Sequence, residues 1–373
     1  MGVPVMTRRG CFSRWTVKAV LLAGLVMAAC GGCVDPAALV GFRDSGRSPR
    51  IRLASYASSS LGTVFIGPND LGTHSYRSGG DEGNGILYAC KAGHIDIAHL
   101  RKAADWTAYL ADKTYKELKQ KRRKFTFKLW EPSRYFVRLE YPANWDELAE
   151  IEKDLITRDV SIKLGQYFAF TGLTWHEILT WFGYSSVPWY PEFPSAFSWE
   201  DVFSNLLGTH LAVEALLSTG HSYDEAMTLA LARTVAQLDA RPRETARRAA
   251  QSAKGRWYEG NLLFLVDIRK RNLDIGLDDG RVTPWIIPFL PECRGVVPQA
   301  YPVPTLDLLG MHGFSVKVEI EPRELQKKRI LRIVYPDPKQ RRKRLEPAVH
   351  FPAIMEYIRQ DVIRRYGPGA DMP

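Results

Sequence analysis

Two histidines and an aspartate fall within six residues of the stretch GHIDIAHLRKAADWT, residues 93–107. They are His94, Asp96 and His99, in a chain that contains only eight histidines. Imidazole and carboxylate groups are common zinc ligands, so this spacing between a strand and a helix predicts part of a metal site. The same pattern also fits an ordinary helix start, in which Asp96 is the N-cap and His99 faces solvent. The sequence leaves both interpretations open.

A histidine–glutamate pair occurs in the segment GLTWHEILTWFG, residues 172–183. The zinc-protease motif needs a second histidine where this chain has Thr180, so a metalloprotease is not predicted. We expect His176 to join the first group of ligands around a divalent metal ion such as zinc. Glu177 or Asp105 would then act as the general base that activates water. Alternatively, Glu177 completes a capping box and has a purely structural role.

Aromatic and polar residues near these histidines are expected to line the pocket of the site. Ligand sites commonly combine aromatic walls with a few polar groups. One histidine lies between two tryptophans, and a later helical segment carries three polar side chains and a glycine on one face. The expected pocket residues are Trp175, Trp181, Asp201, Ser204 and Asn205. The alternatives are that the aromatic segment packs on the core and that the polar face is the solvent-exposed side of a helix.

The elements that must position these residues predict an α+β fold. A helical core is expected near 97–255, with antiparallel β-hairpins before and after it. A short strand is expected at 85–90, and alternating apolar and polar residues predict a hairpin at 125–141. Two further hairpins are expected at 273–287 and 314–336, in a hairpin-rich C-terminal part covering about 256–373.

The expected helices have recognisable starts. Capping boxes satisfy the free amides at a helix N-terminus with a polar N-cap side chain and an acidic residue three positions later. Four such patterns occur, at 144–147, 174–177, 198–201 and 222–225. Other helices are expected at 97–122, 241–254 and 353–366.

The N-terminus reads as an export signal followed by a lipid attachment site. A basic segment precedes the apolar run AVLLAGLVMAA, which is too short to span a bilayer comfortably. The residues before Cys30 resemble a bacterial lipobox, and Cys33 offers a second position for the lipid. We therefore expect a signal peptide at 1–29, a lipidated tether at 30–60 and a single globular domain at 61–373. An uncleaved membrane anchor is the alternative. The residue after either cysteine is not aspartate, so we expect an outer-membrane lipoprotein that faces the periplasm.

Charge and cysteine content agree with export. The formal net charge is +10, and the first 29 residues contain four basic and no acidic residues, so the remainder carries 10 − 4 = +6. That charge is too modest for a nucleic-acid partner, but it suits an anionic membrane surface or an acidic envelope polymer. In an oxidising compartment, Cys90 and Cys293 are expected to form a disulfide.

Four stretches taken together resemble a known family. They are the lipobox, YACKAGHIDIAHLRKAADWT, TWHEILTWFG and SWEDVFSNLLG. As a set they are similar to an uncharacterised family of bacterial lipoproteins, domain of unknown function 4056, over most of the mature chain. The resemblance implies a bacterial protein anchored in the cell envelope. It brings no known activity, cofactor or catalytic residue.

Two hypotheses follow from the sequence. The first is an envelope lipoprotein with a pocket for metal-assisted hydrolysis, in which histidines and Asp96 hold the metal ion. The second is a non-catalytic envelope lipoprotein that binds or scaffolds another envelope component through its basic surface, with structural histidines.

Overall fold

The computed structural model describes residues 48–373 except 53–54, 78–80, 187–191 and 263–264. The expected signal peptide at 1–29 and the candidate lipidation sites Cys30 and Cys33 lie outside the described residues. Within the described residues, no helix is long and apolar enough to cross a membrane.

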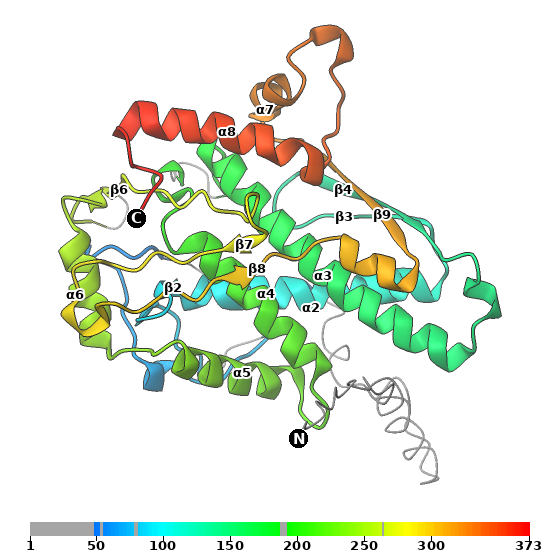
Figure 1. Ribbon diagram of the computed structural model, residues 1–373, viewed down its shortest axis with the longest axis horizontal. Helices are drawn as coiled ribbons and strands as arrows, with labels where there is room; N and C mark the ends of the chain where they lie inside the picture. The colour runs from blue at the N-terminus through cyan, green and yellow to red at the C-terminus, as the bar shows by residue number, and fades with distance from the viewer. Residues whose placement is uncertain (1–47, 53–54, 78–80, 187–191, 263–264) are drawn as a thin grey trace, which may run out of the picture. The chain divides into compact units, whose positions relative to one another are not determined.

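Three long helices form the centre of the structure, with α2 packed against both α3 and α4 (Figure 1). They span Ile97–Lys119 (α2), Glu150–Trp181 (α3) and Asp201–Leu217 (α4). α3 runs antiparallel to α2, whereas α4 runs parallel to it. The C-terminal end of α3 therefore lies near the N-terminal ends of α2 and α4.

Small residues allow these helices to approach closely. A Cβ atom at Gly165 of α3 would lie 2.7 Å from both the Cβ and the backbone nitrogen of Ala111 in α2. A Cβ atom at Gly208 of α4 would lie 2.8 Å from the carbonyl carbon of Leu100 in α2 and 3.0 Å from the Cβ of Ala103. Such distances are shorter than side chains tolerate, so both contacts require glycine.

Among the described residues, four small antiparallel sheets surround this helical core. β1 (Ile86–Ala89) pairs with β2 (Gly93–Asp96), which leads directly into α2. β3 (Lys124–Phe127), β4 (Arg134–Glu140) and β9 (Ser315–Glu321) form a three-stranded sheet with β4 in the centre. The two remaining sheets are two-residue ladders, formed by β5 (Tyr258–Glu259) with β6 (Asp267–Ile268), and by β7 (Arg281–Val282) with β8 (Tyr301–Pro302).

Four further helices complete the described fold. They are α5 (Tyr223–Gln237), α6 (Arg243–Ala253), α7 (Lys327–Val334) and α8 (Pro347–Tyr366). α5 packs on α4, α6 packs on β1, and α7 packs on α8. The architecture is α+β, as the sequence predicted.

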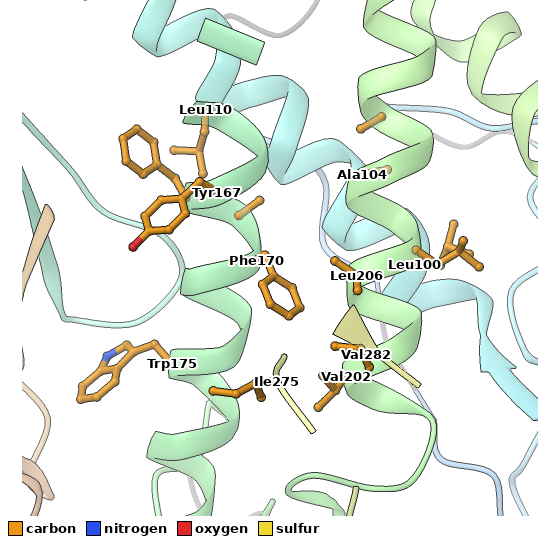
Figure 2. Close-up of a cluster of buried hydrophobic side chains, with 14 of the residues drawn as sticks. Leu100, Ala104, Leu110, Tyr167, Phe170, Trp175, Val202, Leu206, Ile275 and Val282 are labelled. Carbon is orange, nitrogen blue, oxygen red and sulfur yellow. The ribbon is translucent and has the colours of Figure 1, made fainter. Parts of the chain in front are cut away.

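Two hydrophobic clusters stabilise the structure. The larger one lies among α2, α3 and α4 and includes Leu100, Phe170 and Leu206 (Figure 2). The smaller one joins α6 and the β1–β2 hairpin to the segment around Trp257 and Trp285. Both clusters lie within one compact unit spanning residues 40–373.

The predicted helix starts were right at some positions and wrong at others. Asp96 is the N-cap of α2, and 222–225 forms a complete capping box at the start of α5. The expected start at 174–177 was wrong, because α3 continues through it without interruption. At 144–147 there is only a short 3₁₀ turn, and at 198–201 the N-cap of α4 is Glu200.

The predicted hairpins had a similar outcome. The hairpin at 125–141 is confirmed by the pairing of β3 with β4. The hairpin at 273–287 was wrong, because β7 pairs with β8 some twenty residues further on. The hairpin at 314–336 was also wrong: β9 pairs with the distant β4, and the second half folds as α7. Cys90 and Cys293 form a disulfide, with their Cα atoms 5.1 Å apart.

Candidate functional site

His99 and Asp96 form a pair at the N-terminal end of α2. Asp96 Oδ1 accepts hydrogen bonds from the backbone amides of Ala98 and His99, at 2.7 and 3.1 Å. Asp96 Oδ2 lies 3.0 Å from His99 Nδ1 and accepts a second hydrogen bond from the Ser55 amide. The predicted N-cap role of Asp96 is therefore correct, but the same carboxylate also holds the imidazole of His99 in a fixed orientation.

Two acidic residues at the start of α4 adjoin this pair. Asp201 Oδ1 lies 3.2 Å from His99 Nδ1, so two carboxyl groups face the same ring nitrogen. Glu200 accepts a hydrogen bond of 2.6 Å from the Ala57 amide. Burial, together with the charges of Glu177 and Glu200, raises the pKa of Asp201 well above its usual value. Burial also raises the pKa of Glu200 to about 8. Burial therefore favours the protonated form of both carboxyl groups.

Asp96 behaves in the opposite way. Burial alone would raise its pKa, but the charge and hydrogen bonds of His99 and the Ser55 amide outweigh burial and lower it. Asp96 is therefore ionised at neutral pH and is the charged partner of His99. Its place at a helix N-terminus adds to this preference, because that end of the helix dipole is positive.

A second histidine–carboxylate pair lies near the C-terminal end of α3. His176 Nδ1 is 2.7 Å from Glu131 Oε1, which comes from the loop between β3 and β4. Burial would lower the pKa of His176, but the hydrogen bond and charge of Glu131 outweigh burial and raise it. The neighbouring Glu177 accepts a hydrogen bond of 2.8 Å from the Phe197 amide.

The two histidine pairs share the same neighbouring charges. The charges of Glu177 and Lys102 act on both His99 and His176, so both imidazoles lie near the same lysine and glutamate. The histidine side chains keep 12% and 19% of their surface exposed, whereas their carboxylate partners keep 1% and 5%. Lys102 is half-buried and makes no hydrogen bond or ion pair with any described residue. Two partly exposed imidazoles, each paired with a buried carboxylate, are therefore within electrostatic reach of one lysine that is unpaired among the described residues.

The polar face of α4 belongs to this region and is not solvent-exposed as the alternative interpretation held. Asp201, Ser204 and Asn205 are all buried. Ser204 Oγ accepts a hydrogen bond from the Asp96 amide and donates one to the Glu200 carbonyl. Asn205 Oδ1 finds no hydrogen-bond donor among the described residues. The face is polar and buried because it packs on α2 at Gly208.

His94 does not belong to the candidate site, so its prediction as a metal ligand was wrong. Its Nε2 lies 3.2 Å from the Ala246 carbonyl, and its Nδ1 accepts a hydrogen bond from Trp199 Nε1. Both ring nitrogens are thus occupied in the smaller hydrophobic cluster, on the α6 side of the β1–β2 hairpin. Burial lowers the pKa of His94 to about 4, so the ring is neutral.

Asp105 is also outside the site, and its prediction as a general base was wrong. Its Oδ2 lies 2.6 Å from Arg52 and its Oδ1 lies 2.9 Å from His74 Nε2. Arg52 in turn bonds both carboxylate oxygens of Glu82, which also pairs with Arg101. This fully buried ionic network fastens the segment before the first strand to α2, which is a structural role.

The two tryptophans expected in the pocket are core residues. Trp175 is fully buried, stacks on Phe351 of α8 and donates a hydrogen bond to Ser133. Trp181 is buried and lies under the guanidinium groups of Arg271 and Arg365, at 5.6 and 5.7 Å. Neither ring faces the histidines with a free surface.

Within the described parts of the chain, no three histidine, cysteine, aspartate or glutamate residues are grouped so as to hold a metal ion. The sequence prediction did not identify Glu131, Lys102 or Glu200 as site residues. The glutamate lies 45 residues before His176 in a loop, and no local pattern marks it. Lys102 could have been found, since it lies one helical turn after His99 on the same face of α2.

The described region is an α+β domain whose helix ends gather two histidine–carboxylate pairs around one lysine. Residues 62–267 match the model of a family described as "Protein of unknown function (DUF4056)". These 206 residues are more than half of the chain, so the protein belongs to this family. No curated protein and no solved structure matches the chain. The matched segment contains all members of the site, namely Asp96, His99, Lys102, Glu131, His176, Glu177, Glu200 and Asp201.

Proposed function

We propose that this protein is a bacterial cell-envelope lipoprotein with a hydrolytic site formed by His99, His176 and Lys102. The export signal and the lipobox support the envelope location. One observation carries the catalytic part: each of two accessible imidazoles is held at Nδ1 by a buried carboxylate, so that its Nε2 is left for chemistry. Carboxylate-backed histidines are the usual arrangement of acid–base catalysts.

The two histidines have different roles in this proposal. Burial, followed by the charge of Lys102, lowers the pKa of His99, which leaves it neutral near pH 7 and able to accept a proton. The raised pKa of His176 favours its protonated form, which can donate a proton. Neighbouring groups whose environments move their pKa values apart commonly divide the work of acid and base in this way.

The proposed reaction is the addition of water to a carbonyl carbon or a phosphorus atom. His99 Nε2 accepts a proton from the water molecule while the water oxygen forms the new bond. His176 donates a proton from Nε2 to the leaving group as the old bond breaks. Lys102 stabilises the negative charge that develops on the substrate oxygen. Proton exchange with solvent then restores both histidines.

A divalent metal ion is the alternative means of activating water, and it would need further ligands, because no three suitable side chains are grouped among the described residues. Histidines that bind metals generally donate their other ring N–H to a carboxylate, as His99 and His176 can. In that case Asp96 and Glu131 would orient the ligands, and Glu177 would be the base.

The direct test is a set of variants measured with chromogenic carboxylic and phosphate diester substrates. We expect His99→Ala, His176→Ala and Lys102→Met each to lower kcat/KM by 10²-fold or more. His312→Ala is the matched control, because this imidazole also contacts a carboxylate, at 2.6 Å, and its side chain is 23% exposed. The control should retain full activity.

Two further measurements make the proposal independent of the substrate chosen. Titration of the histidine ring protons by NMR should give a pKa below 6.5 for His99 and above 6.5 for His176. Equal, unshifted values would contradict the assigned roles. Metal analysis of protein purified without chelator separates the two means of activating water, since a bound ion would be lost in both histidine variants.

The lipoprotein assignment has its own test. If it is right, one of the two variants Cys30→Ser and Cys33→Ser should no longer be labelled by a fatty acid.

A further inference from the structure

One segment of the structure concentrates positive charge on its surface. Residues 327–344, which we name the basic lobe, comprise α7 and the connection to α8. They contain nine basic residues and one acidic residue, a net charge of 9 − 1 = +8. Residues 30–373 together carry +6, so the rest of that part of the chain is at 6 − 8 = −2. The basic surface expected from the sequence is therefore this lobe and not a general property of the chain.

Most of these charges are free to meet a partner. All but one of the nine basic side chains are exposed. Arg344 pairs with Glu319 and Glu321, and Arg329 lies over two aromatic rings. Arg341 donates a hydrogen bond to the Tyr335 carbonyl. The side chains of the six others make neither an ion pair nor a hydrogen bond with any described residue, namely Lys327, Lys328, Arg332, Lys339, Arg342 and Lys343.

The lobe is a folded surface rather than a loose tail. Ile330 and Leu331 are buried and fasten α7 to α8. The Tyr335 hydroxyl donates a hydrogen bond of 2.7 Å to the Arg344 carbonyl, which closes the loop, and Leu345 bridges to β9. In Figure 1 the lobe (orange) lies beyond α8 (red), on the side away from α2 and α4.

An apolar side chain adjoins the charged residues. Leu325, two residues before α7, is 95% exposed. Basic residues beside an exposed leucine are typical of surfaces that lie in the headgroup region of a bilayer, where charge attracts the lipid and the apolar group inserts. A nucleic acid or a soluble polyanion could pair with the basic side chains, but it has no apolar region that would contact the leucine.

We propose that the basic lobe is a docking surface for a bilayer that contains anionic phospholipid. Lysine and arginine side chains bind phosphate headgroups, and the exposed leucine enters the acyl boundary. This contact is separate from the hydrolytic site and does not depend on it. It would hold the folded domain against a membrane surface in addition to any lipid at the N-terminus.

The experiment uses the chain from Val34 onward, which contains the whole compact unit and lacks both lipidation sites. Binding is measured by co-sedimentation with vesicles of phosphatidylcholine alone or with about one quarter phosphatidylglycerol. We expect binding only to the anionic vesicles, and its loss at high salt. Replacing Lys327, Lys328, Lys339 and Lys343 with glutamine should weaken it by about tenfold or more.

A matched variant replaces four exposed basic residues elsewhere, Lys124, Lys128, Arg138 and Arg294, with glutamine. It should bind the anionic vesicles as the parent chain does, whereas equal losses in both variants would overturn the proposal. Leu325→Ser should weaken vesicle binding but not binding to polyphosphate. Binding to polyphosphate without binding to anionic vesicles would also overturn it and point to a soluble polyanion.

Discussion

Replacing Gly208 with alanine should disturb the contact between α4 and α2. The new Cβ atom would lie 2.8 Å from the Leu100 carbonyl carbon, and ordinary contacts begin near 3.4 Å. It would also overlap the Leu100 carbonyl oxygen, which lies closer still, so the helices must separate by more than 3.4 − 2.8 = 0.6 Å. Overpacking of this kind costs about 1–3 kcal/mol, and the better helix propensity of alanine returns at most about 1 kcal/mol. We expect a net loss of about 1–2 kcal/mol in the free energy of unfolding.

Urea unfolding followed by tryptophan fluorescence measures this loss as a lower midpoint with an unchanged slope. Gly310→Ala is the control, because a Cβ atom there meets nothing within 4 Å. Its free energy of unfolding should stay within about 0.5 kcal/mol of that of the parent. A Gly208→Ala protein as stable as the parent would refute the close packing.

The same substitution should also change the environment of His99 in the candidate site. Asp201 at the start of α4 and His99 at the start of α2 face each other at 3.2 Å across this helix pair. If α4 moves away, the pKa of His99 should change in the NMR titration, while Gly310→Ala should leave it unchanged.

Three further predictions concern the forces that hold the domain together. Arg52→Met should cost about 3–5 kcal/mol, because it leaves the carboxylates of Asp105 and Glu82 buried without their main partner. Cys293→Ser should lower the thermal midpoint, because the disulfide to Cys90 closes a sequence separation of 203 residues, and the chain-entropy model assigns such a loop up to about 5 kcal/mol. The parent should also lose stability as the pH falls below about 4. The reason is Glu82, because the hydrogen bonds and charge of Arg52 outweigh the effect of burial and hold its pKa well below the usual range.

The sign of the pH effect follows from the lowered pKa. A carboxylate that ionises more readily in the folded state contributes stability above its unfolded pKa, near 4.3, and loses it as the pH falls towards the folded value. Glu82→Gln should therefore be less stable at pH 7 and show a shallower loss between pH 5 and pH 3. Parallel curves for the two proteins would contradict this account. Lys116→Met removes a largely exposed partner of Asp112 and should have little effect on either curve.

Some local signals in the sequence predicted local structure, whereas the capping patterns at 144–147, 174–177 and 198–201 did not mark the helix starts expected there. The N-cap Asp96, the capping box at 222–225 and the hairpin at 125–141 depend on residues a few positions apart, and all three are confirmed. The failed hairpin at 314–336 has a different cause. β9 pairs with β4, which lies about 180 residues earlier, and no local pattern encodes a partner at that distance.

The candidate site shows the same limit. The sequence selected His99, His176 and Asp96 from the spacing of imidazole and carboxylate groups, and in the structure each of these histidines has a carboxylate at its Nδ1. It could not know that His94 points into the smaller hydrophobic cluster, because its partners Ala246 and Trp199 lie more than 100 residues further along the chain. It also could not find Glu131, which reaches His176 only through the packing of the β3–β4 loop on α3.

The pairing of β4 with β9 bears on how the chain can be divided. The family match ends at residue 267, but β9 and Phe351, which covers Trp175, lie beyond that point. A fragment of the matched residues alone would leave one side of β4 without a neighbour, and such open strand edges promote aggregation. The last hundred residues thus pair with β4 and bury Trp175 in the folded domain. Truncation at the family boundary is therefore expected to yield insoluble protein.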